Sequence, residues 1–185
     1  MRVLGVSGSL RDSSYNTSLL RAALEAAPDG IELELWEGIG DLPLYDEDLE
    51  DDVPESVRRL REDWAAADAI LFSTPEYNGS VPGGLKNAVD WASRPKLEGV
   101  LRNKSVAVVG ASTGQFGALW AQQDLKRILG MTGARVVGTE IPVSRAHERV
   151  DSSGRLLDGE VFEQLRLHLT TLASEAVAAP DRIAV

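Results

Sequence analysis

Residues 3–20 read VLGVSGSLRDSSYNTSLL and contain, in order, a short apolar run, a polar loop and the start of a helical pattern. The apolar run Val3–Val6 suits a strand that is buried on both faces of a sheet. The helical pattern Asn16–Ala27 carries its leucines and alanines on one face. A strand that leads through a short loop into a helix is the opening unit of a parallel α/β sheet.

The same alternation of strand and helix continues along the rest of the chain. Strand-like runs occur at Val3–Val6, Ile31–Trp36, Ala69–Ser73, Ser105–Val109 and Ala134–Val137. Helical patterns occur at Asn16–Ala27, after Pro54, and at Gly83–Ser93, Gly117–Leu129 and Glu160–Ala179. In the second run apolar residues alternate with glutamates, which is typical of an edge strand. The order predicts a flavodoxin-like α/β fold of three layers (α, β, α), with a five-stranded parallel sheet of order 2-1-3-4-5. We expect residues 1–185 to form a single domain.

Composition excludes several classes of function. The 185 residues carry 19 Lys and Arg against 29 Asp and Glu, a net charge of −10, which argues against binding to nucleic acid or to acidic membranes. The chain has no cysteine, so disulfides, thiolate nucleophiles and iron–sulfur clusters are excluded, and with two histidines we expect no metal site. The first residues lack the long apolar stretch of a signal peptide, and we expect a cytoplasmic protein. The acidic run Asp46–Asp52 is interpreted as a solvated loop.

The loop after the first strand is rich in hydroxyl groups and lies just before a helix N-terminus. Backbone N–H groups, hydroxyl donors and the positive end of the helix dipole favour an anion there, and Arg11 adds a charged fork. Neither GxxxxGK[ST] nor GxGxxG is present, so a terminal monophosphate fits better than a nucleoside triphosphate or a dinucleotide. The alternative is that these side chains only cap the helix.

A serine hydrolase is a competing interpretation, because Ser7 and Ser9 lie at the end of a strand. The GxSxG motif is absent, and His147 and His168 both lie late in the chain, the second within a helical pattern. We therefore disfavour nucleophilic catalysis by serine.

The loop after the third strand reads STPEYNGSVPGGLKNAVDW over residues 73–91. Its prolines and glycines restrict the backbone to an ordered loop. The ring of Tyr77 can cover a flat heterocycle, and rigid backbone amides can bond its polar edge; alternatively, Tyr77 simply packs on the sheet. Because the loops after strands one and three meet at the switch point of such a sheet, a planar ligand with a phosphate is favoured.

The motifs GSLRDSSYN (residues 8–16) and TPEYNGSVPGGLKNAVDW (residues 74–91) together resemble the NAD(P)H-dependent FMN reductase family, near its bacterial quinone and chromate reductases. LPLYDEDLE (42–50) and GASTGQFGALWAQQDLKRIL (110–129) follow in the expected order, so the resemblance covers most of the chain. It implies a flavodoxin-like fold, non-covalent FMN, and NADPH or NADH as co-substrate. The chain departs from the pattern at Trp120, where many relatives carry Arg.

The resemblance also implies site residues in three loops. Those expected to hold the phosphate are Ser9, Arg11, Ser14, Tyr15 and Asn16. Those expected to line the isoalloxazine ring, largely through backbone groups, are Pro75, Glu76, Tyr77, Asn78 and Gly79, with Ser112 and Thr113 in a third flavin loop. Lys86 and Asn87 are interpreted as structural, and no side chain is assigned an acid–base role, because the flavin carries the hydride chemistry.

The function expected is an FMN-dependent NAD(P)H oxidoreductase that passes electrons to a small-molecule acceptor such as a quinone or a flavin. The alternative is a flavodoxin-type electron carrier, and a flavin-binding redox sensor is a weaker third. A homodimer or homotetramer is expected, because one face of the flavin would otherwise stay exposed to solvent and Trp91, Phe116 and Trp120 offer apolar surface near the loops. The resemblance points the same way. The alternative is that these aromatic residues belong to the core, and for Trp91 this interpretation is almost as strong.

Overall fold

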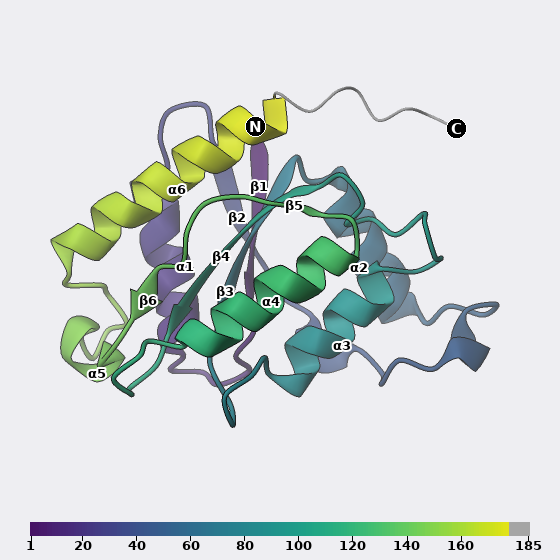
Figure 1. Ribbon diagram of the computed structural model, residues 1–185, viewed down its shortest axis with the longest axis horizontal. Coiled ribbons are helices and arrows are strands. Elements are labelled where there is room, and N and C mark those ends of the chain that lie inside the picture. Colours follow the sequence, from purple (N-terminus) through teal and green to yellow (C-terminus); the bar gives the residue numbers. More distant parts are fainter. Residues whose placement is uncertain (178–185) are drawn as a thin grey trace.

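Three apolar runs form the centre of the sheet. In the computed structural model, which describes residues 1–177, the parallel strands β1 (Arg2–Ser7), β3 (Ala69–Thr74) and β4 (Ser105–Ala111) lie side by side (Figure 1). The short strands β2 (Glu32–Trp36) and β5 (Arg135–Val136) flank them, and the order β2-β1-β3-β4-β5 confirms the predicted topology.

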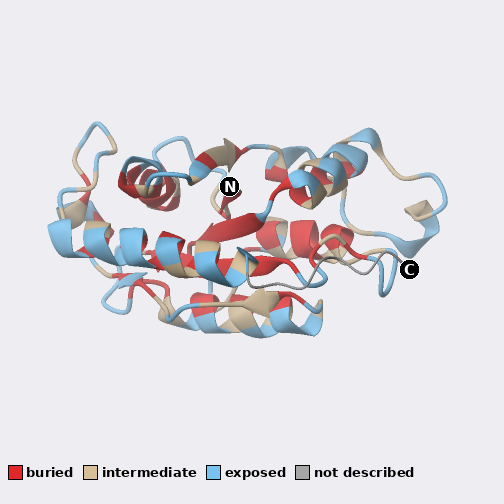
Figure 2. Cartoon of the chain, turned by 90° about the horizontal axis from the view of Figure 1, so that it is seen from above, coloured by how far each residue is buried: buried red, intermediate tan, exposed pale blue. Residues whose placement is uncertain are grey.

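Helices cover both faces of this sheet and enclose two separate cores. One core lies between the sheet and the helices α1 (Tyr15–Ala26) and α6 (Gly159–Val177). The other lies under α2 (Glu55–Ala66), α3 (Gly83–Ala92) and α4 (Leu119–Met131). Every residue of β3 and β4 is buried, as expected of strands covered on both sides, and the buried residues follow the sheet through the middle of the molecule (Figure 2).

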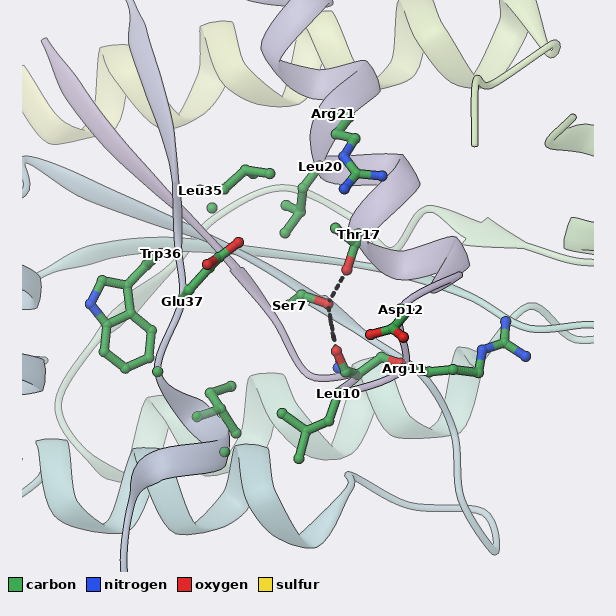
Figure 3. A pocket seen from close by; sticks show the side chains of 15 residues that line it. Ser7, Leu10, Arg11, Asp12, Thr17, Leu20, Arg21, Leu35, Trp36 and Glu37 are labelled. Atoms are coloured by element: carbon green, nitrogen blue, oxygen red, sulfur yellow. Dashed lines mark hydrogen bonds between the residues drawn. The ribbon is translucent and has the colours of Figure 1, made fainter. Parts of the chain in front are cut away.

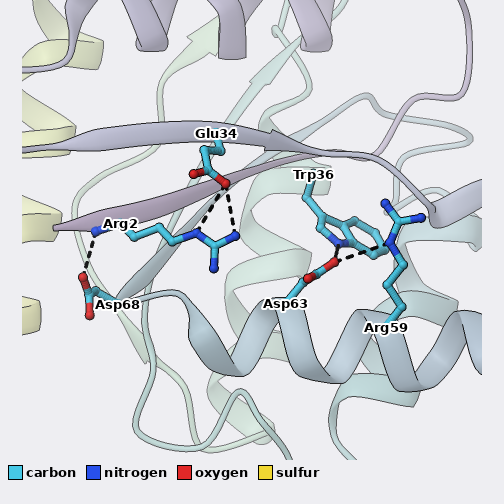
Figure 4. A network of polar contacts seen from close by, with 6 residues as sticks. All are labelled: Arg2, Glu34, Trp36, Arg59, Asp63 and Asp68. Atoms are coloured by element: carbon cyan, nitrogen blue, oxygen red, sulfur yellow. Dashed lines mark hydrogen bonds and ion pairs between the residues drawn. The ribbon is translucent and has the colours of Figure 1, made fainter.

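Strand β2 is an edge strand, as its alternating sequence predicts. Its Glu34, which shares a face of the strand with Trp36, forms an ion pair with Arg2 of β1, with Arg2 Nη2 and Glu34 Oε2 3.1 Å apart (Figure 4). At the end of the strand, the indole Nε1 of Trp36 donates a 2.8 Å hydrogen bond to Asp63 of α2. The ion pair joins the two strands, and the Trp36 bond fastens the edge of the sheet to α2.

The fifth position of the sheet differs from the prediction. A single strand over Ala134–Val137 was expected, but β5 has only two residues, and a further two-residue strand, β6 (Pro142–Val143), pairs with the end of β4. Gly138 lies between them with a φ of 73°, which turns the chain away from the sheet. The sheet therefore has a sixth strand in addition to the five that were predicted.

The boundaries of several other elements also differ from the prediction. Helix α4 begins two residues after the predicted Gly117, because Gly117 and Ala118 have left-handed φ values of 57° and 60°. The short helices η1 (Ile39–Asp41), η2 (Glu47–Leu49) and α5 (Ala146–Arg149) were not anticipated. The last predicted helix extends to residue 179, and its final two positions lie outside the described residues.

The described part of the chain lacks a helix that could cross a membrane and a cluster of side chains that could hold a metal ion. Within residues 1–177, no helix combines the length and the apolar character that a membrane crossing requires. The same residues contain no group of three or more His, Cys, Asp or Glu side chains arranged to hold a metal ion.

Candidate functional site

Three loops leave the sheet at the same edge. Ser7 at the end of β1 lies opposite Ser73 of β3, and Thr74, the last residue of β3, lies opposite Gly110 of β4. Because the strands are parallel, the loops that follow β1, β3 and β4 start side by side. Ten of the twelve predicted site residues lie in these loops, and the other two, Tyr15 and Asn16, are the first residues of α1. The structure therefore brings the predicted set to one end of the sheet.

The side chain of Asn16 connects the start of α1 to the ends of β3 and β4, where the three loops begin. Its side chain is 3% exposed, and its Nδ2 donates to the backbone carbonyl of Ala111 at 3.1 Å. Its Oδ1 accepts from Ser73 Oγ at 3.0 Å and from the Ala111 N–H at 2.9 Å. The side chain therefore points into the protein. What Asn16 can offer a phosphate is its backbone N–H, which lies in the first turn of α1, where helix amides lack an intrahelical acceptor.

The first loop, residues 7–14, is held in shape by hydroxyl groups. Ser14 is the N-cap of α1, and its Oγ accepts from the Thr17 N–H at 3.2 Å, which leaves the hydroxyl proton free to donate. Ser7 Oγ accepts from Thr17 Oγ1 at 3.0 Å and from the Ser9 N–H at 3.3 Å. The loop thus gathers hydroxyl donors around the positive end of a helix.

Arg11 supplies the cation of this loop. It is exposed, its guanidinium lies 5.2 Å from the centroid of the Tyr15 ring, and its Nη2 donates to the Ser13 carbonyl at 2.7 Å. A guanidinium has five N–H donors, so these contacts hold the group over the loop and leave donors for an anion.

A cavity of about 380 Å³ lies beside the first loop, between the carboxyl ends of β1 and β2 (Figure 3). Ser9 and Arg11 of the predicted set line it, together with Thr17, Arg21 and Glu37. Residues of the β3 and β4 loops are not among its lining residues. The space thus adjoins the predicted phosphate loop on the β2 side, away from the loops predicted to hold the flavin ring.

The loop after β3 forms a tight hairpin whose tip is Asn78 and Gly79. The Tyr77 N–H donates to the Ser80 carbonyl at 3.1 Å, and the Ser80 N–H returns a 3.2 Å bond to the Tyr77 carbonyl. The two tip residues have φ values of 53° and 75°, as a type I′ turn requires, which explains the Asn-Gly pair. Tyr77 is 54% exposed, so it does not simply pack on the sheet.

Both stems of this hairpin are attached to α4. The Glu76 carboxylate accepts from the Ala121 N–H in the first turn of α4, at 3.2 Å from Oε2. Ser80 Oγ donates a 2.8 Å hydrogen bond to Asp124 Oδ2, one turn further along the helix. Glu76, predicted to contact the flavin ring, therefore also caps a helix, and Asp124 is a contributor that the motifs did not indicate.

The loop after β4 is supported by the segment around β6. Ser112 donates its N–H to the Val143 carbonyl at 3.1 Å and accepts from the Ala146 N–H at 3.0 Å, whereas Thr113 is exposed. A Cβ on Gly117 would lie 2.5 Å from the carbonyl carbon of Pro142, so only glycine fits there. Sequence reasoning missed this support, because a two-residue strand has no periodic pattern to detect.

A buried histidine packs behind the same segment. His168 of α6 is 7% exposed, and a Cβ on Gly138 would lie 2.7 Å from its Nε2. Lys126 of α4 donates to the Gly138 carbonyl at 2.9 Å and pairs with Glu140 at 3.3 Å. Burial, followed by the positive charge of Lys126, lowers the pKa of His168, while the Thr139 backbone and Glu140 act in the opposite direction.

Asn87 and Trp91 of α3 hold the 43–45 segment. Asn87 accepts from the Tyr45 N–H at 2.8 Å and donates to the Pro43 carbonyl at 2.9 Å, which agrees with its structural interpretation. Trp91 also donates to Pro43 and is 0% exposed. The expectation that Trp91 offers apolar surface to a flavin was therefore wrong, because its ring is part of the interior.

Phe116 and Trp120 do lie on the surface. They are 51% and 47% exposed, and their ring centroids are 4.8 Å apart. They flank the start of α4, next to the third flavin loop, as the sequence predicts.

The family profile described as NADPH-dependent FMN reductase matches residues 1–148. An NAD(P)H-dependent FMN reductase of Pseudomonas aeruginosa is 44% identical over 174 residues, covering 93% of each chain. A quinone reductase of Escherichia coli is 36% identical over 174 residues, covering 92% of each.

Among solved structures, FerB from Paracoccus denitrificans, described as a flavoenzyme NAD(P)H:(acceptor) oxidoreductase, superposes with a TM-score of 0.86. It is 36% identical, and the match covers 96% of this chain and 98% of FerB. The fold, the three converging loops and these matches agree with one another. The chain belongs to the NADPH-dependent FMN reductase family and is an FMN-dependent NAD(P)H oxidoreductase.

Proposed function

We propose that FMN binds across the three loops and that the chain uses it to reduce quinones with electrons from NAD(P)H. The observation that carries the proposal is the convergence of the loops after β1, β3 and β4 at one edge of the sheet. The residues proposed to contact FMN are Ser9, Arg11, Ser14, Tyr15, Asn16, Pro75, Glu76, Tyr77, Asn78, Gly79, Ser112 and Thr113.

The donor set of the first loop fits a phosphate monoester. Arg11 brings one full positive charge, Ser9 and Ser14 bring hydroxyl groups, and the first amides of α1 point along the positive end of the helix dipole. Tyr15 holds the guanidinium by cation–π contact, and Asn16 contributes through its backbone N–H. A single arginine suits a terminal monophosphate.

The hairpin fits the polar edge of a flat heterocycle. Its exposed tip presents the backbone groups of Asn78 and Gly79 in a fixed turn, and Tyr77 adds an exposed ring. Buried Pro75 limits movement at the base of the loop. Bound FMN would supply the redox chemistry, which is hydride acceptance from NAD(P)H and electron transfer to the acceptor. The chain's own residues bind and orient the ligands, and Ser112 and Thr113 border the ring from the β4 side.

Quinones are the proposed acceptors because relatives that match over nearly their whole length bear that description, including a 2-hydroxy-1,4-benzoquinone reductase of a Burkholderia species, 36% identical over 179 residues. We propose that NAD(P)H and the quinone use the same open side of the site in turn. Steady-state kinetics with both substrates varied should then give parallel double-reciprocal lines. Intersecting lines would contradict this ordering.

A homodimer or homotetramer is proposed, with the Phe116–Trp120 pair in the contact. The two rings are tilted by 55° to one another, and each is about half exposed beside the site, so together they form an apolar patch that a second chain can cover. Trp120→Glu should weaken association, measured by light scattering from nanomolar to micromolar concentration, and lower activity together with it. A fully active monomer across that range would contradict the proposal.

We further propose that residues 1–185 form one flavodoxin-like domain and that the enzyme is cytoplasmic. One continuous sheet supports the first proposal. On one face of it, α1 near the start of the chain and α6 near the end of the described residues share a single core with β1 and β4. The low content of basic residues and the absence of cysteine agree with the second.

Stopped-flow reduction is the decisive test of the proposed function. The protein is loaded with FMN and mixed anaerobically with NADH or NADPH alone. A reductase should bleach the flavin rapidly, and adding a benzoquinone should restore the colour. A flavodoxin-type carrier would be bleached hardly at all by the nicotinamide, and a protein that takes up no FMN would contradict both interpretations.

A further inference from the structure

The hairpin at residues 76–80 has little of its own to hold its shape. Its internal bonding consists of the two backbone hydrogen bonds between Tyr77 and Ser80. A short hairpin of this kind is at best marginally stable by itself in water. Its position above the end of the sheet therefore depends on contacts with other elements.

Those contacts are made on one face of α4. Ala121 and Asp124 are separated by one helical turn, so they lie on the same side of the helix. The Ala121 N–H donates to Glu76 Oε2 at 3.2 Å, and Asp124 Oδ2 accepts from Ser80 Oγ at 2.8 Å. The bond to Ala121 holds Glu76, just before the paired residues Tyr77 and Ser80, and the bond to Asp124 holds Ser80. Together the two bonds fix the position and the tilt of the hairpin relative to α4.

The two bonds differ in what supports them. Glu76 bonds a helix N-terminus, where the dipole would attract a carboxylate of any orientation. The bond from Ser80 to Asp124 requires a directed hydroxyl and a directed carboxylate, and its acceptor is charged. Asp124 is thus the residue that sets the angle between the hairpin and α4.

We propose that Asp124 is a positioning residue for the flavin ring. It acts through Ser80 and holds the Tyr77–Gly79 tip at the angle at which its backbone groups meet the ring. The proposal rests on the proposed function, since it assigns the ring to this hairpin. It assigns no contact between Asp124 and either FMN or substrate.

A matched control exists on the same helix. Asp124 also faces Arg127, with Arg127 Nη2 and Asp124 Oδ1 3.7 Å apart and the arginine side chain 69% exposed. Arg127→Gln removes this weak surface pair and leaves the bond to Ser80 in place. Asp124→Asn keeps an acceptor oxygen for Ser80 and loses the charge.

The experiment measures FMN affinity by quenching of flavin fluorescence for Asp124→Ala, Ser80→Ala, the double variant, Asp124→Asn and Arg127→Gln. We expect each alanine variant to bind FMN about three- to tenfold more weakly, as the loss of one hydrogen bond predicts. The double variant should be no weaker than the single ones, because both remove the same bond. Asp124→Asn should recover most of the affinity, and Arg127→Gln should match the parent.

A second measurement needs no flavin. Amide hydrogen exchange of the FMN-free protein should accelerate at Tyr77 and Ser80 in Asp124→Ala but not in Arg127→Gln. Unchanged exchange and unchanged affinity in Asp124→Ala would overturn the proposal, and so would additive losses in the double variant. If exchange accelerates while the parent protein fails to bind FMN, the hairpin is positioned as described and it is the proposed function that fails.

Discussion

The first loop and the hairpin are attached to the protein in opposite ways. The first loop leads into a buried anchor, because the Asn16 side chain is 3% exposed and bonds the ends of β3 and β4. The hairpin is attached at the surface, where Glu76 and Ser80 bond α4. The attachment through Asn16 is part of the folded core, whereas the attachment through Glu76 and Ser80 lies outside it.

This difference separates two consequences of mutation. A substitution at a buried polar anchor leaves its partners unsatisfied, so it should reduce the stability of the whole domain. After a substitution at a surface attachment, the partner groups can form hydrogen bonds with water instead. Such a substitution should therefore change the geometry of the loop and hardly affect the stability of the domain. The substitutions below test this separation.

Asn16→Ala should have the largest effect. It leaves the Ser73 hydroxyl and both backbone groups of Ala111 without their partner, so we expect a loss of about 3 kcal/mol in the free energy of unfolding. Ser73→Ala removes only one of these bonds and should cost about 1 kcal/mol. Denaturant unfolding of the FMN-free proteins measures both. Equal stability of Asn16→Ala and the parent would show that the anchor is not in the core.

Arg11→Ala should weaken FMN binding and leave the fold intact. A hydrogen bond to a charged group contributes about 1.5–3 kcal/mol, so affinity should fall about ten- to a hundredfold. Arg11→Lys should recover only part of it, because the planar fork is lost. Riboflavin, which lacks the phosphate, should bind all three proteins similarly. If riboflavin binding fell as much as FMN binding, Arg11 would not be the phosphate ligand.

Gly79→Ala should have a smaller, local effect. With a φ of 75°, an alanine there costs about 1 kcal/mol, although no atom lies within 4 Å of the added Cβ. The strain can be relieved by distorting the exposed tip, so the melting temperature should hardly change while FMN affinity falls. Gly83→Ala also has open space around its Cβ but no positive φ, and it should leave both unchanged. A large fall in melting temperature for Gly79→Ala would place the hairpin within the core unit.

The smallest effect at neutral pH concerns His168, which belongs to the support of the third loop. Its pKa in the folded chain is lowered by burial and by Lys126, so the unfolded chain binds the proton more readily. Its contribution to stability is complete above the ordinary histidine pKa of about 6.5 and is lost as the pH falls through the folded pKa.

Thermal melts from about pH 8 to about pH 5 should show this loss in the parent and a flatter profile in His168→Gln. His147 is exposed, and His147→Gln provides the control. Parallel profiles for the parent and His168→Gln would show that this group does not contribute to acid sensitivity.

Much of the fold could be predicted because it depends on patterns that the sequence displays directly. Continuous apolar runs marked β1, β3 and β4, and the glutamates of β2 marked an edge. The division of the fifth position into β5 and β6 could not be predicted, because two-residue strands are set by their pairing with β4 and not by their own composition.

The candidate site divides in a similar way. The loops and their residues could be placed from motif and topology, but the direction of each side chain could not. Asn16 points inward, and Trp91 is buried under the 43–45 segment, because the polar groups they bond belong to distant parts of the chain. Asp124 was missed because a helical aspartate looks like any solvated surface residue until its partner is known.

The interruption between β5 and β6 also affects whether a strand of another chain can pair with this edge of the sheet. An edge strand with unpaired N–H and C=O groups can recruit another chain and grow into an aggregate. On one side of this sheet, the edge strand β2 carries two negatively charged residues, Glu32 and Glu34, which disfavour pairing with another chain. On the other, the edge is divided into two-residue pieces, one of which begins with a proline that has no N–H to donate. Charge on one border and interruption on the other therefore both oppose open-ended growth by strand addition.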